Sequence, residues 1–143
     1  MMGFFKKKKR INVTDTFINC NRYQKLSCVN FLVGVSCIDG PPNLEELNCI
    51  NKYVDIFRVT SQECTDRLNS FGVTQVIEDL KSLSFNQKQI LFRISLEIIY
   101  IDSPPKKHEI SFVETSFLDI GLNGQEQKEI LRSVIKSGDF LSE

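Results

Sequence analysis

Residues 38–46 read IDGPPNLEE and residues 101–109 read IDSPPKKHE, so one loop sequence occurs twice in the chain. The two copies are 63 residues apart (102 − 39), and their isoleucine, aspartate, both prolines and final glutamate are identical. With the same offset carried outward, residues 24–68 and 87–131 share nine identities in 45 aligned pairs, where chance gives about three. We interpret this as an internal duplication of one hairpin whose turn is the copied loop.

The spacing of apolar residues predicts a helix on each side of both loops. Lys25 to Ile38 and Phe85 to Ile101 are apolar on more than one face, which is typical of buried helices. Leu44 to Arg58 and Pro105 to Ile120 carry apolar residues at steps of three and four, which indicates amphipathic helices. No competing strand pattern occurs.

Capping patterns predict where several helices begin. A Ser, Thr or Asn followed three residues later by Glu or Gln marks a helix start, and four such pairs stand at predicted helix starts: Asn43–Glu46, Thr60–Glu63, Ser84–Gln87 and Asn123–Glu126. The other predicted helices are a short one at about Thr14 to Tyr23, one ending near Gly72, one from Thr74 to Leu83, and one ending near Lys136. We therefore predict an all-α fold. It is a single-domain helical bundle of seven or eight helices built from two pseudo-symmetric hairpin repeats (about 24–68 and 87–131), with the two buried helices as antiparallel or crossed partners.

Composition is that of a soluble globular domain. Of the 143 residues, 41% are hydrophobic and 25% charged, and no apolar run approaches the roughly 18 residues of a membrane span. The five cysteines form no Cys-x-x-Cys pair, which favours a reducing, cytoplasmic compartment, and we assign them no chemistry.

The N-terminal segment concentrates positive charge. Residues 1–12 are predicted to be a basic, unstructured tail, and residues 13–143 the helical domain. The residues with a predicted membrane-surface role are Phe4, Phe5, Lys6, Lys7, Lys8, Lys9 and Arg10. Two interpretations stay open: a solvated tail, or peripheral contact with anionic lipid at the inner membrane face. Without this block the chain has thirteen basic and eighteen acidic residues, so we expect no nucleic-acid partner.

The copied loop places one acid at the end of each buried helix and another seven residues later. Asp39 and Asp102 lie where helix carbonyls run out of partners, and carboxylates with free carbonyls are the ligands that Ca²⁺ and Mg²⁺ prefer. The alternative is a purely structural elbow. In the first copy a capping box explains Glu46, but in the second Lys106 replaces the capping residue while Glu109 persists. Capping alone therefore does not account for both glutamates.

These features, a helix ending in Ile-Asp-Gly (38–40), an acid seven residues on and the repeated hairpin, resemble the TerB-like tellurite-resistance domain family over about Gln24 to Leu131. The resemblance implies an all-α pseudo-twofold bundle that binds a divalent metal and acts in stress-response or membrane-linked assemblies rather than in catalysis. The implied metal ligands are Asp39, Glu46, Asp102 and Glu109. The sequence departs from the family pattern at Ser103, where the family has glycine, and Lys106 and Lys107 add positive charge.

We expect a non-enzymatic function. His108 is the only histidine, and no glycine-rich phosphate loop, Gly-x-Ser-x-Gly or His-Glu-x-x-His occurs. The first hypothesis is a TerB-like domain that binds Ca²⁺ or Mg²⁺ through the acidic elbows and takes part in a protein assembly. The alternative is a metal-free helical protein-interaction module, which predicts an exposed apolar groove as the most distinctive surface feature.

Overall fold

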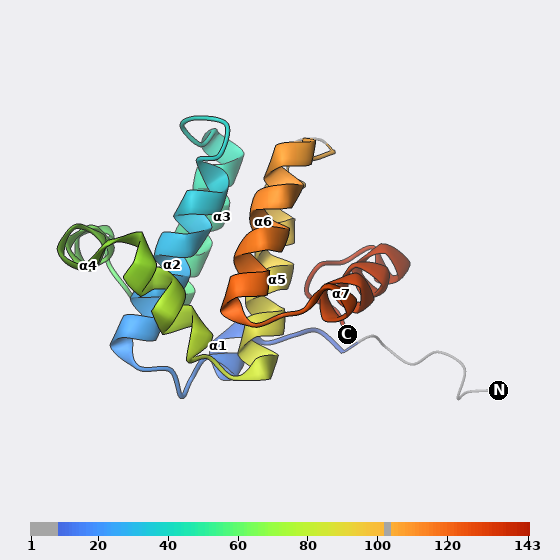
Figure 1. Ribbon diagram of the computed structural model, residues 1–143, viewed down its shortest axis with the longest axis horizontal. Helices are drawn as coiled ribbons and strands as arrows, with labels where there is room; N and C mark the ends of the chain where they lie inside the picture. Colours follow the sequence, from blue (N-terminus) through green and yellow to red (C-terminus); the bar gives the residue numbers. More distant parts are fainter. Residues whose placement is uncertain (1–8, 102–103) are drawn as a thin grey trace.

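The computed structural model describes residues 9–101 and 104–143, and over these ranges the chain is helical without a β-strand (Figure 1). The described helices are α1 (Val13–Thr16), α2 (Arg22–Ser36), α3 (Leu44–Phe57), α4 (Ser61–Lys81), α5 (Phe85–Ile99), α6 (Lys107–Ile120) and α7 (Gly124–Ser137). The predicted all-α bundle of seven or eight helices is confirmed, with seven helices in the described ranges. The two helices predicted before Gly72 and after Thr74 form one helix, α4, which bends at Gly72. None of the described helices combines the length and the apolar character needed to cross a bilayer.

Side-chain caps set the helix starts. All four capping boxes predicted from the sequence are present, at α3, α4, α5 and α7. A fifth box, Asn21 with Gln24, starts α2 three residues before the predicted Lys25, because polar residues form the first turn. The predicted helix from Thr14 to Tyr23 is wrong in extent: α1 has only four residues and is capped by Asn12.

The helices flanking the two loops end earlier or begin later than predicted. α2 and α5 stop two residues short of their isoleucines. α6 begins at Lys107 rather than at Pro105, because Lys106 has an extended backbone and is the N-cap of the helix. α5 and α6 begin and end 63 residues after α2 and α3, respectively. The helix bounds thus follow the offset of the copied loop, and the duplication itself stays a prediction.

The core lies between α2 and α5, both buried along most of their length. Three aromatic rings join the two hairpins: Phe31 and Phe92 each contact Phe117 edge-on, with centroids 5.3 Å and 5.1 Å away. The C-terminal ends of α2 and α5 reach the same end of the bundle (Figure 1), so these helices run in the same direction. The antiparallel alternative in the prediction is therefore wrong.

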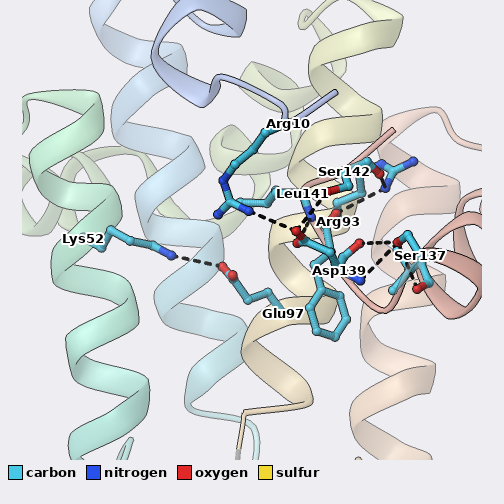
Figure 2. A network of polar contacts seen from close by, with 10 residues as sticks. Arg10, Lys52, Arg93, Glu97, Ser137, Asp139, Leu141 and Ser142 are labelled. Carbon is cyan, nitrogen blue, oxygen red and sulfur yellow. Dashed lines mark hydrogen bonds and ion pairs between the residues drawn. The ribbon is translucent and has the colours of Figure 1, made fainter. Parts of the chain in front are cut away.

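The first described residues, 9–11, are joined to the C-terminal segment on one side of the bundle (Figure 2). The Ile11 amide donates to the Leu141 carbonyl at 2.8 Å, and Arg10 pairs with Asp139 at 3.0 Å. The buried Arg93 of α5 donates to the Ser142 carbonyl at 3.0 Å. The folded part therefore begins before residue 13. Of the residues with a predicted membrane-surface role, Lys9 and Arg10 are exposed, and those from Phe4 to Lys8 lie outside the described residues.

Candidate functional site

The described parts of the two copied loops, here called elbows, lie at the same end of the bundle (Figure 1). Asp39 of the first elbow contacts His108 Nε2 at the start of α6, and Lys106 Nζ lies 3.8 Å from the same carboxylate. The hydrogen bond from His108 and the nearby Lys106 charge lower the pKa of Asp39. In the second elbow, Lys106 therefore supplies positive charge and His108 a hydrogen bond next to the acid of the first.

Both predicted glutamate ligands have a structural role. The Glu46 carboxylate accepts the Asn43 amide at 3.1 Å, and the Glu109 carboxylate accepts the Lys106 amide at 2.9 Å. Lys106 itself makes no side-chain cap, so α6 keeps only the glutamate half of a capping box. The sequence argument that capping could not account for Glu109 is wrong. The hydrogen bond from the Lys106 backbone amide to the Glu109 carboxylate forms whether or not the capping residue has the side chain of an Asn.

Three of the four predicted metal ligands share a cavity. Asp39, Glu46 and Glu109 line a hollow of about 230 Å³ between the elbows, together with Lys106. Asp102 lies outside the described residues. Over residues 9–101 and 104–143, no three His, Cys, Asp or Glu side chains are arranged to hold a metal ion. The described carboxylates therefore do not complete a coordination shell by themselves.

A much larger hollow lies between α2, α4 and α6. Its volume is about 820 Å³, and its walls are mostly apolar. Figure 1 shows α2 and α6 side by side, with α4 crossing α2. We call this hollow the α2–α4–α6 groove; its lining residues are Asn30, Phe31, Val33, Gly34, Cys37, Leu68, Val73, Val76, Ile77, His108, Ser111, Phe112, Thr115, Ser116 and Asp119.

Each helix contributes a different kind of surface to the groove. α4 provides aliphatic side chains, among them Val73, which is 69% exposed. α6 provides Phe112, 40% exposed, within a row of small hydroxyl residues. On α2, a Cβ added at Gly34 would meet no atom within 4 Å, so open space stands above this glycine. The groove therefore has apolar walls and room for a backbone to approach.

A partly buried ion pair holds the bend of α4. Residues Val73 to Ile77 of this helix form one wall of the α2–α4–α6 groove. α4 bends at Gly72, whose φ of 78° is outside the helical range. Arg67 before the bend donates to Asp79 after it at 2.9 Å, and their side chains are only 10% and 11% exposed. Ser27 of α2 also donates to Asp79, at 2.5 Å. These bonds fix the two halves of α4 against α2.

The net effect of these contacts is to lower the pKa of Asp79. Partial burial raises that pKa, but hydrogen bonds from Ser27, Arg67 and Gln75 outweigh the burial and stabilise the carboxylate. Arg67 also lies over the rings of Tyr23 and Phe71, at 4.2 Å and 4.5 Å. Both charges therefore have partners within the fold, and the pair positions the groove wall.

The cysteines differ sharply in access. Cys37 is exposed and lines the groove at its elbow end, whereas Cys28, Cys49 and Cys64 are buried. Burial and the nearby Glu97 carboxylate raise the pKa of Cys49 to about 12, so that thiol stays protonated at neutral pH. Cys37 is thus a natural chemical reporter for the groove.

Sequence reasoning identified the elbows and missed the groove residues. Val73 falls between two predicted helices, and Phe112 lies in the predicted helix Pro105 to Ile120 without a predicted role. Large apolar residues at positions that the helical periodicity does not place in the core were the available signal. Comparison of the chain with known protein families, characterised proteins and solved structures gave no match. The TerB-like resemblance therefore stays a prediction that rests on the loop residues quoted for it.

Proposed function

We propose that this domain is a non-enzymatic protein-interaction module that receives the apolar face of a partner helix in the α2–α4–α6 groove. The observation that supports this is the size and apolar lining of the groove, which is the surface feature expected of such a module. Its lining residues include three ionisable side chains, those of Cys37, His108 and Asp119. A neutral apolar helix face therefore matches it better than a charged one.

The dimensions of the groove suit a helix of a few turns. From His108 to Asp119, α6 rises about 16 Å at roughly 1.5 Å per residue, which is about three helical turns. Over that length a partner helix presents apolar side chains at steps of three, four and seven residues. Gly34 and the small Ser111 and Thr115 leave room for its backbone.

Reaction of Cys37 with a thiol reagent tests occupancy of the groove. Probe peptides would first be selected for binding to the domain from a library of amphipathic helices about 15 residues long, with apolar positions varied at the spacing above. We expect a saturating probe to slow the reaction of Cys37 with N-ethylmaleimide by about tenfold or more, because the thiol becomes covered. Cys20, half-buried outside the groove, is the internal control, and mass spectrometry of tryptic fragments gives both rates.

Selected peptides that bind tightly but leave the rate at Cys37 unchanged would count against the groove as the docking site. Equal slowing at Cys20 would indicate a general change in the fold rather than local cover.

A second candidate function is binding of a divalent cation at the elbows, in keeping with the TerB-like resemblance. The observation that favours it is the cavity shared by Asp39, Glu46 and Glu109. Each of these carboxylates keeps acceptor capacity beyond its present hydrogen bonds. A role in a stress-response assembly would follow only from the resemblance.

Thermal unfolding with and without Ca²⁺ or Mg²⁺ tests the cation hypothesis. At a concentration about 100 times the dissociation constant, a bound ion adds about 2.7 kcal/mol to the free energy of unfolding, which raises the melting temperature by roughly 5–10 °C in a domain of this size. Asp39→Asn with Asp102→Asn should remove that gain. The matched control, Asp55→Asn with Asp66→Asn, should keep it, and no gain in the unmodified protein would end the hypothesis.

A further inference from the structure

A cavity of about 400 Å³ lies between residues 10–14 and helix α3, with Leu141 of the C-terminal segment as a further wall. Small-molecule sites in proteins have volumes of about 300–1,000 Å³, so this cavity is large enough for a small ligand. Two cations line it, Arg10 and Lys52, and none of its described lining residues is acidic. We call it the Arg10–Lys52 cavity.

Arg10 and Lys52 each have an acidic partner in the fold and keep further donors. Arg10 Nη1 donates to Asp139 at 3.0 Å, and Lys52 Nζ lies 3.5 Å from Glu97 (Figure 2). A guanidinium has five N–H groups and an ammonium has three, so these contacts use a minority of the donors. Both acids stand outside the lining of the cavity. The cavity therefore offers spare donors but little spare net charge, which favours a singly charged acid over a dianion.

The walls of this cavity are fixed by contacts with the core. Tyr53 is buried, and its hydroxyl donates to Glu97 at 2.6 Å. Lys52 Nζ lies 4.8 Å from the centre of the Tyr53 ring, which holds the ammonium near the cavity. On the other side, the Ile11 amide donates to the Leu141 carbonyl at 2.8 Å. The donors are therefore attached to segments that the fold holds in place.

A second, mostly apolar cavity of about 170 Å³ borders the first, because Val13, Thr14 and Ile56 line both. Its walls include Phe17 and Phe57, whose rings meet edge-on with centroids 5.0 Å apart. We call it the Phe17–Phe57 cavity. Its lining suits a hydrocarbon chain next to the donors of the Arg10–Lys52 cavity.

The charged residues around the Phe17–Phe57 cavity are compatible with an anionic ligand. Lys25 and Arg58 line it, and none of its described lining residues is acidic. Asp15 and Asp55 are exposed on α1 and α3 but line neither cavity. The stems of long basic side chains cover apolar surface while their charged ends stay in water.

We propose that the two cavities together bind a monocarboxylate with an aliphatic chain, the chemistry of a medium-chain fatty acid. The carboxylate accepts charge-assisted hydrogen bonds from Arg10 and Lys52, and the chain crosses Ile56 into the Phe17–Phe57 cavity. The α2–α4–α6 groove and the two cavities have no described lining residue in common, so this inference is independent of the proposed function.

NMR titration of the full chain with octanoate tests the proposal. We expect saturable chemical-shift changes at the backbone amides of residues 10–14 and 52–58. Octanol lacks the charge and acetate lacks the chain, so each should bind at least about tenfold more weakly. Lys52→Gln should weaken octanoate binding by about fivefold or more. The matched control is Lys81→Gln, which should change binding by less than about twofold, because Lys81 is also about half exposed and paired with a glutamate but lines neither cavity.

Thr14→Phe tests the path of the chain independently of charge. Thr14 is exposed and lines both cavities, so the added ring should fill their border and weaken octanoate binding by about tenfold without changing the circular dichroism spectrum. Thr74→Phe, at an exposed position of α4, should bind octanoate like the unmodified protein. The proposal is overturned by the absence of a saturable shift up to about 10 mM octanoate, by equal affinity for octanol, or by equal octanoate affinity of Lys52→Gln and Lys81→Gln.

Discussion

Asp79→Ala is expected to lower the free energy of unfolding by about 3–5 kcal/mol, because it leaves the Arg67 guanidinium in a mostly buried site without its counter-charge. The same change removes the acceptor for Ser27 and Gln75. Arg67 Nε already has no hydrogen-bond partner, so without Asp79 the guanidinium keeps its ring contacts but loses its hydrogen bonds to the carboxylate. Urea unfolding followed by circular dichroism measures the effect.

Glu78→Ala is the matched control for this loss. Glu78 is the residue before Asp79 and pairs with Lys81 at 3.0 Å, but both side chains are about half exposed. An exposed pair of this kind contributes about 0–1 kcal/mol. If Asp79→Ala destabilises the domain no more than Glu78→Ala does, the ion pair does not hold the bend of α4.

The same carboxylate gives a pH dependence whose sign follows from its lowered pKa. The stabilisation from Asp79 is fully present above the pKa of an unfolded aspartate, about 3.9, and is lost as the pH falls through the lower pKa of the folded state. Asp79→Asn should therefore flatten the fall in unfolding free energy that the unmodified protein shows below about pH 4.

Gly34→Leu is expected to reduce the affinity for groove-binding peptides by about tenfold to a hundredfold. The added side chain would occupy the open space above α2, where a partner helix has to approach. Because leucine is a better helix former than glycine by roughly 0.5–1 kcal/mol, the variant should be no less stable than the unmodified protein. Loss of binding would then report a blocked groove and not a damaged fold.

Local sequence signals predicted the helices well because each signal depends on neighbouring residues. The box of Asn123 with Glu126 is one example. The predicted helix end near Gly72 is another, since the backbone leaves the helical range there, although α4 continues beyond this bend. The apolar runs also identified α2 and α5 as buried helices. The start of α2 was missed because Asn21 precedes the first apolar residue of the pattern.

The candidate sites could be predicted only in part, because they depend on contacts between distant segments. The contact of His108 with Asp39 joins residues 69 positions apart, and no local pattern reports which polar residue will face the elbow acid. The groove is harder still. Val73 and Phe112 belong to different helices, and helical periodicity gives the face that each residue occupies but not whether two exposed faces meet.

Calorimetric titration of a selected probe peptide into three proteins tests the proposed function most directly: the unmodified domain, Gly34→Leu and Gly124→Leu. Gly124 is the matched control, because it also lies in a helix with open space at its Cβ but outside the groove. The helix-docking hypothesis predicts that Gly124→Leu binds the peptide like the unmodified domain while Gly34→Leu loses at least about 1.4 kcal/mol of binding free energy, a factor of ten in affinity. Equal affinity of all three proteins would contradict it.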